Sequence, residues 1–363
     1  MPIDYKKILR LFVSAFMFLC VTTIIGLNMR AGHQLLFALG VIILFALLVK
    51  NIWLTLFMWL SCLLFTIYKF EFGQVYITNI FYGAILFYIT KIAFEKQHID
   101  WFIKIFLWLV VANLGYSILQ VLNFDFIYRF SENLYIPFLS FAKIPSPNGF
   151  MGNSGITGCL YAFAVPLIAR KSIWLAVAML IPIFILRAFA ALTGGFVALL
   201  FVMWFRVDRK IWIASLMGVL VASGAYLAYF DMPGLERVHL WKMALSDAKC
   251  HPIKGFGMDS FRKITSSKNF DYQQGEVNPS LWDNPHNLLV SLFFEFGFLV
   301  FLILGGYIRH LILLFNRSLN TIALAGFIVC FFVVSMGSFL AFLCRTMVII
   351  IPMFALYEIS AVR

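Results

Sequence analysis

Long apolar segments alternate with short polar connections along most of the chain. The apolar segments lie near residues 8–27, 34–49, 52–68, 74–93, 101–121, 154–169, 172–187, 189–205, 211–230, 290–308, 321–339 and 341–359. A helix of about 20 predominantly apolar residues crosses the hydrocarbon core of a bilayer, and these segments approach that length. The pattern therefore predicts an all-α polytopic membrane protein with about twelve transmembrane helices.

Composition agrees with this prediction. Of the 363 residues, 63% are hydrophobic and 12% are charged, whereas about 25% of the residues of a soluble domain are charged. The first segment follows Lys6, Lys7 and Arg10 but lacks a small-residue cleavage site, so we interpret it as an uncleaved first span. Among the six cysteines only Cys250 lies outside an apolar segment, and no CxxC pair occurs. They indicate neither a disulfide framework nor a metal site.

Lysine and arginine are unevenly distributed between the two sides of the predicted bundle. Connections on one side carry most of them, and connections on the other side, apart from the loop at 231–285, carry few: Arg30, Lys69, Arg129 and Lys143. Because positive residues concentrate in cytoplasmic loops, both termini are predicted to be cytoplasmic. The asymmetry accounts for most of the net charge of +12. Since the basic residues are dispersed over separate loops, they do not indicate nucleic-acid binding.

Two long connections fall on the predicted outer side. Residues 122–153 interleave aromatic and polar residues, which is typical of a segment in the headgroup region. Residues 231–285 form the large polar loop of the chain. Its first part has apolar residues at helical spacing: Leu235, Val238, Trp241, Leu245 and Ala248. This spacing predicts an amphipathic helix that rests on the outer membrane surface.

The stretch WDNPHNLLVSLFFEFG, residues 282–297, returns the large loop to the membrane. Asn284 suits a helix N-cap and Pro285 suits the first helical position, so His286 is predicted to lie in the first turn. There the positive end of the helix dipole disfavours an imidazolium, and a neutral histidine can accept a proton. A polar stripe follows on the predicted helix and should face a cavity or a protein neighbour, because contact with lipid would be costly: Asn287, Ser291 and Glu295.

These residues, taken together, resemble the O-antigen ligase and Wzy-type polymerase family. The family signature has an arginine before a tryptophan, a His-Pro-x-x-Gly-x-Gly turn, a His-Asn pair and a Glu-x-Gly end. The matching positions are Arg237, Trp241, His251, Pro252, Gly255, Gly257, His286, Asn287, Glu295 and Gly297. Upstream, GFMGN at residues 149–153 is similar to the Gly-x-x-x-Asn segment of the family. The motifs divide the chain into residues 1–148, with N-terminal transmembrane helices, and 149–363, the ligase-like catalytic membrane region.

The resemblance implies a metal-independent inverting glycosyltransferase of C-class architecture that needs no cofactor. Such an enzyme transfers a glycan from undecaprenyl diphosphate to an acceptor at the outer face of the bacterial cytoplasmic membrane. Fixed positive charge binds a diphosphate leaving group, and arginine supplies it in bidentate form, so Arg237 is the expected diphosphate-binding residue. His286 is the expected general base for the acceptor hydroxyl. Trp241, Asn287 and Glu295 are expected to support them.

One position departs from the family pattern. Where the family carries an arginine in a Ser-Arg-Gly-type motif, this chain reads Thr193, Gly194 and Gly195. Arg187 lies about two helical turns earlier, so in a continuous helix it would occupy a similar face about 10 Å along the axis. Arg345, in the last predicted span, is an alternative. Both arginines are candidates for diphosphate binding, and both can also be explained as side chains that snorkel to an interface.

Several functions remain open from the sequence. The ligase interpretation has lipid A core as the acceptor, whereas a Wzy-type polymerase would extend an O-antigen or exopolysaccharide glycan. A transporter of the lipid-linked glycan is a third possibility, and it predicts internal repeats and ionisable residues at mid-span. The sequence shows no evident internal repeat. A structural interpretation also exists for each residue, since Arg237 suits a headgroup contact and His286 suits a helix cap.

Overall fold

A computed structural model describes residues 5–22, 72–122, 124, 149–151, 154–218, 235–257, 260, 261, 264, 285–337 and 344–361. This part of the chain is helical and contains no strand. The α-helices are α1 (Tyr5–Thr22), α4 (Phe72–Ala93), α5 (Ile99–Val121), α7 (Ser154–Ala169), α8 (Ile173–Ala178), α9 (Leu180–Ile185), α10 (Phe189–Trp204), α12 (Leu235–Ala248), α14 (Leu288–Phe296), α15 (Leu299–Leu314), α16 (Leu319–Ser335) and α17 (Cys344–Ala361). Short 3₁₀ helices cover Lys96–His98 (η2) and Gly149–Met151 (η3).

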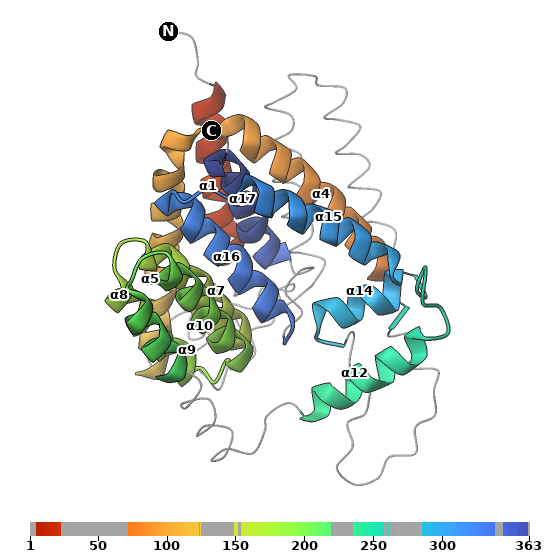
Figure 1. Cartoon of the computed structure of the whole chain (residues 1–363). Coiled ribbons are helices and arrows are strands. Elements are labelled where there is room, and N and C mark those ends of the chain that lie inside the picture. The colour runs from red at the N-terminus through yellow and green to blue at the C-terminus, as the bar shows by residue number, and fades with distance from the viewer. Residues whose placement is uncertain are drawn as a thin grey trace.

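Small residues hold the centre of the bundle together. Helices α7, α10 and α16 pack against one another there (Figure 1). A Cβ atom on Gly194 would lie 2.3 Å from Cγ2 of Val334, and a Cβ atom on Gly326 would lie 2.8 Å from Cβ of Pro166. Glycine therefore lets these helix backbones approach closely, as is common where helices pack inside a membrane.

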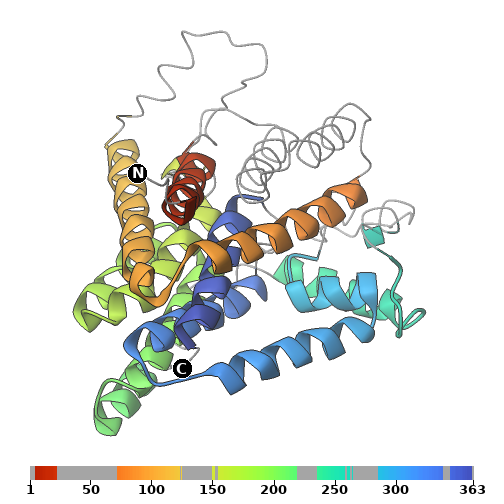
Figure 2. The ribbon, with the colours of Figure 1, turned by 90° about the horizontal axis from the view of Figure 1, so that it is seen from above.

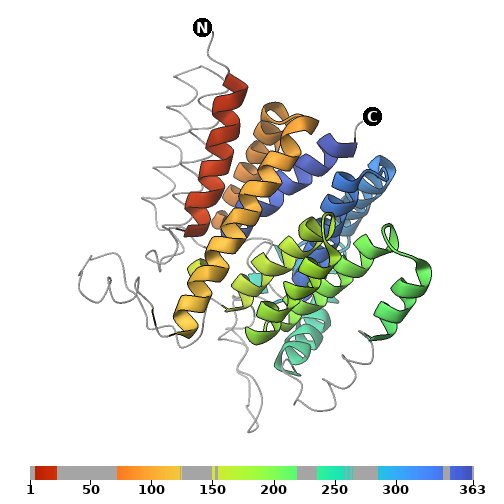
Figure 3. The same cartoon turned by 90° about the vertical axis from the view of Figure 1, so that its left-hand side faces the viewer.

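Both ends of the chain lie at one end of the bundle. Helix α1 begins and α17 ends there, and α12 lies toward the opposite end (Figures 1 and 3). Helix α5 runs beside α1 from the first end toward the second (Figure 3). Seen from above, α15 runs along an edge of the bundle between α14 and the α17 side (Figure 2). This arrangement suits the predicted orientation, in which the termini and the large loop lie on opposite sides of the membrane.

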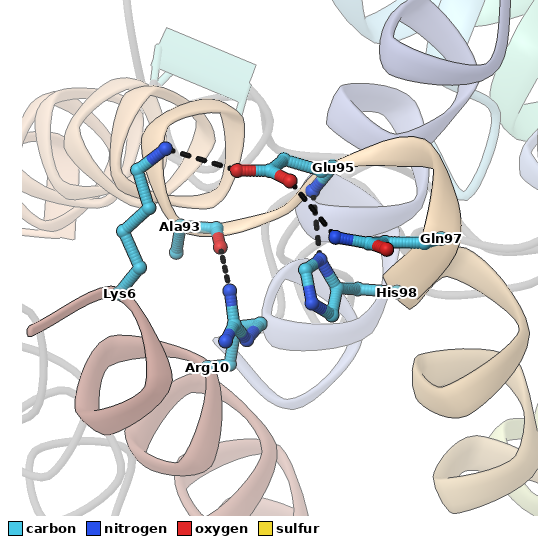
Figure 4. Close-up of polar contacts among 6 residues, drawn as sticks. All are labelled: Lys6, Arg10, Ala93, Glu95, Gln97 and His98. Carbon is cyan, nitrogen blue, oxygen red and sulfur yellow. Dashed lines mark hydrogen bonds and ion pairs between the residues drawn. The ribbon is translucent and has the colours of Figure 1, made fainter. Parts of the chain in front are cut away.

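Polar contacts fix the helix ends near the N-terminus (Figure 4). Nζ of Lys6 lies 3.0 Å from Oε1 of Glu95, and Arg10 donates to the carbonyl of Ala93 at 3.1 Å. The hydrogen bond from Lys6 and its charge hold the pKa of the exposed Glu95 carboxyl below its usual value. The backbone N–H of Glu95 donates to Nδ1 of His98 at 3.3 Å. The contacts join the start of α1 to the turn between α4 and α5.

The sequence predicted most described helices within a few residues. The segments at 154–169, 189–205, 321–339 and 341–359 are α7, α10, α16 and α17. Spans predicted at 34–49 and 52–68 lie outside the described residues. Within the described part, one helical stretch, Lys96–Val121, is long and apolar enough to cross a membrane by length and composition. Several other apolar helical stretches in the described part, of 10–17 residues, do not meet this criterion.

The predicted span at 172–187 is helical over Ile173–Ile185, with a one-residue irregularity at Met179 between α8 and α9. Pro182 accounts for the irregularity, since proline has no N–H to donate to the carbonyl of Ala178, four residues earlier. The prediction of one continuous span at 290–308 was wrong. The segment at 290–308 divides into α14 and α15 at Gly297, which has φ 65° and ψ −159°.

Candidate functional site

The predicted amphipathic helix exists as α12, but its buried face differs from the expected one. Helix α12 lies beside α14 (Figure 1). Its residues Leu240, Ala244 and Ala248 pack against Val290 and Phe294 of α14. Val238 and Leu245, which were expected to share the apolar face, are 38% and 40% exposed. The helix therefore binds another helix of the same chain with one face and leaves other apolar side chains exposed. The expected face was wrong because the apolar residues of α12 cover two adjacent faces of the helix, and their spacing does not show which face is buried.

A backbone clasp joins the loop after α12 to the end of α14. A Cβ atom on Gly255 would lie 2.4 Å from the carbonyl of Glu295, and one on Gly297 would lie 2.3 Å from that of Ile253. Both glycines have positive φ, 66° and 65°. Four backbone hydrogen bonds close the clasp: Phe256 N–H to Phe294, Gly257 N–H to Glu295, Phe298 N–H to Pro252 and Leu299 N–H to Ile253, at 2.9, 2.9, 2.8 and 3.4 Å. The glycines of the two motifs are thus required where two backbones meet.

The start of α14 lies later than the sequence predicted. Asn287 is the N-cap, and its Oδ1 accepts from the N–H of Val290 at 3.1 Å. His286 precedes the cap and has φ 52°, so its predicted place in the first helical turn was wrong. Asn284, the predicted cap, lies outside the described residues. A left-handed residue cannot begin an α-helix, and the next polar side chain along the chain takes the capping position.

Trp241 supports the segment that carries His286. Its Nε1–H donates to the carbonyl of Pro285 at 2.8 Å. Pro285 is buried and His286 is partly buried. Because an indole has a single N–H donor, this bond fixes the ring of Trp241 against the backbone one residue before His286. The contact gives the Arg-Trp and His-Asn motifs a direct connection.

The C-terminal end of α16 brings the candidate residues together. Arg237 donates through one guanidinium N–H to the carbonyl of Gly337. Asn287 donates through Nδ2 to the carbonyl of Met336 at 2.8 Å. The last carbonyls of a helix lack partners within that helix, so they readily accept bonds from arginine and asparagine. Arg237 and His286 therefore come from elements that meet at one helix end.

Arg187 lies near the C-terminal end of α16, but its backbone differs from the one considered in the sequence analysis. It lies between α9 and α10 with φ 53°, so the continuous helix that would have placed it on the face of Gly194 is absent. A Cβ atom on Gly337 would lie 2.8 Å from Cβ of Ala190, which places the start of α10 against the end of α16. The exposed Arg187 is therefore three residues from a contact with Gly337.

Packing explains why Gly194 is not an arginine in this chain. Its missing side chain faces α16, where a Cβ atom would also lie 3.1 Å from the carbonyl of Cys330. An arginine at this position would separate α10 from α16. The backbone of Arg345 lies at the start of α17, and its side chain lies outside what the structure describes.

Backbone strain singles out two of the candidates. Among the described residues other than glycine, those with positive φ are Arg187 and His286. This conformation is uncommon for residues with a side chain. Its cost is of order 1–3 kcal/mol, and such residues concentrate at functional sites. The strain is an observation independent of the sequence motifs, and it falls on the same residues.

The polar stripe of α14 is buried, as expected. Asn287, Ser291 and Glu295 are 9%, 2% and 7% exposed. Glu295 lies at the opposite end of α14 from Asn287, about 12 Å away along the axis at 1.5 Å per residue. Its backbone belongs to the clasp, so the structure separates Glu295 from His286. Among the described residues, no group of three or more histidine, cysteine, aspartate or glutamate side chains is arranged to hold a metal ion.

Sequence reasoning missed Met336 and Gly337 because they contribute carbonyl groups rather than side chains. The stretch SMGS at residues 335–338, inside the predicted segment 321–339, is the signal that could have marked a helix end there. Arg237 and Asn287 meet at this helix end, and the strained His286 is next to Asn287 in the chain. An arginine can bind an anion and a histidine can accept a proton.

Comparison with known proteins adds the family. A family model described as O-Antigen ligase matches residues 155–305. This range includes Arg187, Arg237, His286, Asn287 and Glu295, whereas Arg345 lies outside it. A search of curated proteins finds no match. The predicted resemblance to the O-antigen ligase and Wzy-type family is confirmed.

Proposed function

We propose that this chain, which matches the O-antigen ligase family model over residues 155–305, is a membrane glycosyltransferase of the ligase type. Its donor is a glycan linked to undecaprenyl diphosphate, and its acceptor is lipid A core. The reaction takes place at the outer face of the bacterial cytoplasmic membrane, in a bundle of about twelve spans. The family match supports the general activity, and the observation that carries the proposal is that Arg237 and Asn287, the neighbour of His286, bind consecutive carbonyls at one helix end.

Arg237 binds the donor diphosphate. Its bond to Gly337 orients the guanidinium, which carries several further N–H donors suited to phosphate oxygens. The exposed Arg187 extends this positive region, and Arg345 is a further candidate at the start of α17. Of these cations, Arg237 is partly buried, so its field is screened less than in open water. They stabilise the negative charge that collects on the leaving diphosphate.

His286 accepts the proton of the acceptor hydroxyl. The hydroxyl oxygen forms a bond to the anomeric carbon while the bond from that carbon to the diphosphate oxygen breaks. The diphosphate leaves with the bonding electron pair, and the proton moves to the imidazole. A single displacement of this kind inverts the anomeric centre. Neither a metal nor a cofactor enters the step, and Trp241 and Asn287 support the segment that holds the imidazole.

The experiment uses purified protein in proteoliposomes with lipid-linked glycan as donor. Lipid A core and a second molecule of lipid-linked glycan are offered as acceptors in separate reactions. Covalent transfer to lipid A core is the expected result. Extension of the lipid-linked glycan alone would identify a Wzy-type polymerase. Movement of the donor across the bilayer without a covalent product would identify a transporter and contradict the proposal.

A further inference from the structure

The amide of Asn287 joins two elements that otherwise meet at few points. Its Oδ1 accepts from the N–H of Val290 at 3.1 Å and caps α14. Its Nδ2 donates to the carbonyl of Met336 at 2.8 Å and attaches that cap to the end of α16. Asn287 is 9% exposed, so water competes little for either bond.

The residue that follows Met336 at the end of α16 binds Arg237. Met336 accepts from Asn287, and the adjacent Gly337 accepts from Arg237. Consecutive carbonyls of one backbone therefore carry the bonds to α12 and to the segment of His286. A displacement of Asn287 changes the distance between His286 and Arg237, while the bond of Arg237 to Gly337 remains.

The bond from Asn287 to Met336 matters because the backbone of His286, the preceding residue, is strained. A residue with φ 52° tends to relax toward the common negative-φ regions unless its neighbours hold it. Its neighbours are held from two directions. Trp241 bonds to Pro285 on one side, and Asn287 bonds to Met336 on the other.

We infer that Asn287 is a positioning residue, whose bond to Met336 sets the imidazole of His286 at the working distance from the diphosphate on Arg237. The inference rests on the proposed glycosyltransferase function. A misplacement of about 1 Å can lower a reaction rate by on the order of 10², because the hydroxyl and the anomeric carbon lose alignment. Donor binding depends on arginine and is retained.

The test separates the two bonds of the amide. In Asn287→Ser the hydroxyl is a good N-cap for α14, but it is too short to maintain the bond to Met336. In Asn287→Asp the carboxylate also caps α14 and cannot donate to a carbonyl. The serine variant is neutral and the aspartate variant is charged, so a common result excludes a charge effect on His286. Ser318→Ala is the matched control, since it removes the N-cap at the opposite end of α16, where Oγ accepts from Thr321 at 3.3 Å.

Turnover, the KM for the acceptor and the Kd for the lipid-linked donor are measured for each variant. The expected result is a fall in kcat of about 10- to 100-fold in both Asn287 variants, with a donor Kd within about threefold of wild type. Ser318→Ala should keep its kcat.

The inference is overturned if Asn287→Ser turns over at a near-normal rate, because the cap alone then suffices. It is also overturned if both variants fail to fold, or if they lose donor binding in parallel with turnover, because Asn287 then serves the fold as a whole. The proposed function fails by a different result, namely the absence of transfer by the wild-type protein in the same assay.

Discussion

The clasp between Gly255 and Gly297 yields a prediction that separates backbone strain from steric overlap. Replacing Gly297 with alanine puts a Cβ atom 2.3 Å from the carbonyl of Ile253 and 2.6 Å from the N atom of Lys254. The residue must also hold φ 65° and ψ −159°, a region that is essentially restricted to glycine. The backbone must therefore move, and the hydrogen bonds from Phe298 and Leu299 are lost.

The expected loss of stability is worked from these contacts. The disallowed backbone conformation costs about 1–3 kcal/mol, and each lost hydrogen bond contributes about 0.5–1.5 kcal/mol net. The Gly297→Ala variant should thus lose about 2–6 kcal/mol. Its loop displaces the end of α14, so glycan transfer should fall with it.

Two further substitutions divide the effect into its parts. Gly257 has φ 96°, but a Cβ atom there would meet nothing within 4 Å, so Gly257→Ala carries only the backbone cost of about 1–3 kcal/mol. Gly305 lies within α15 and also has open space around its Cα. Gly305→Ala should therefore stabilise the helix by about 0.5–1 kcal/mol.

The assay is the temperature of half-denaturation in detergent at one fixed heating rate, with transfer activity measured on the same preparations. The expected order of stability is Gly305→Ala, wild type, Gly257→Ala and Gly297→Ala, from highest to lowest. Equal melting of Gly297→Ala and Gly257→Ala would refute the reasoning, since the close approach to Ile253 would then contribute nothing.

Three further predictions concern other parts of the account. Arg237→Lys keeps the charge but loses the planar fork of donors, so transfer should fall at least tenfold and the donor Kd should rise, while a variant with normal affinity would reduce Arg237 to a structural contact with Gly337. Gly194→Ala introduces a Cβ atom 2.3 Å from Val334 and should destabilise the protein by about 1–3 kcal/mol. Gly218→Ala, where a Cβ atom would have nothing within 4 Å, should not destabilise it. Equal melting temperatures of the two variants would show that α10 and α16 can separate freely. The exposed Cys250 should react with a membrane-impermeant maleimide in intact spheroplasts, and Cys250→Ser should remove this reaction; labelling that requires lysis would reverse the orientation.

Helices could be predicted from the sequence because long apolar segments leave few alternatives inside a membrane. Helix α7 and helix α16 followed directly from their apolar segments. The division of the segment at 290–308 could not be predicted in the same way, since it depends on Gly297 in a left-handed conformation. Such conformations are stabilised by contacts with distant segments, as the contact of Gly297 with Ile253 illustrates.

The residues of the site could be predicted by type, but their contacts could not. The Arg-Trp and His-Asn motifs indicated Arg237 and His286, and arginine and histidine are the side chains that diphosphate binding and proton transfer require. Their common attachment at Met336 and Gly337 gave no signal in those motifs, because a backbone carbonyl is present at every position. The N-cap was placed at Asn284 rather than Asn287 because both residues suit a cap.

The central claim is that His286 removes a proton from the acceptor, and turnover of His286→Gln tests it most directly. Glutamine retains hydrogen-bonding capacity, so it preserves a structural role at the start of α14, but it cannot accept a proton near neutral pH. Transfer and donor binding are measured together for wild type, His286→Gln and His286→Ala in proteoliposomes. The account predicts that both variants bind the donor and turn over more slowly by on the order of 10² to 10⁴, the range for a positioned general base. Near-normal turnover by His286→Gln would contradict the account and leave His286 as a residue that shapes the loop before α14.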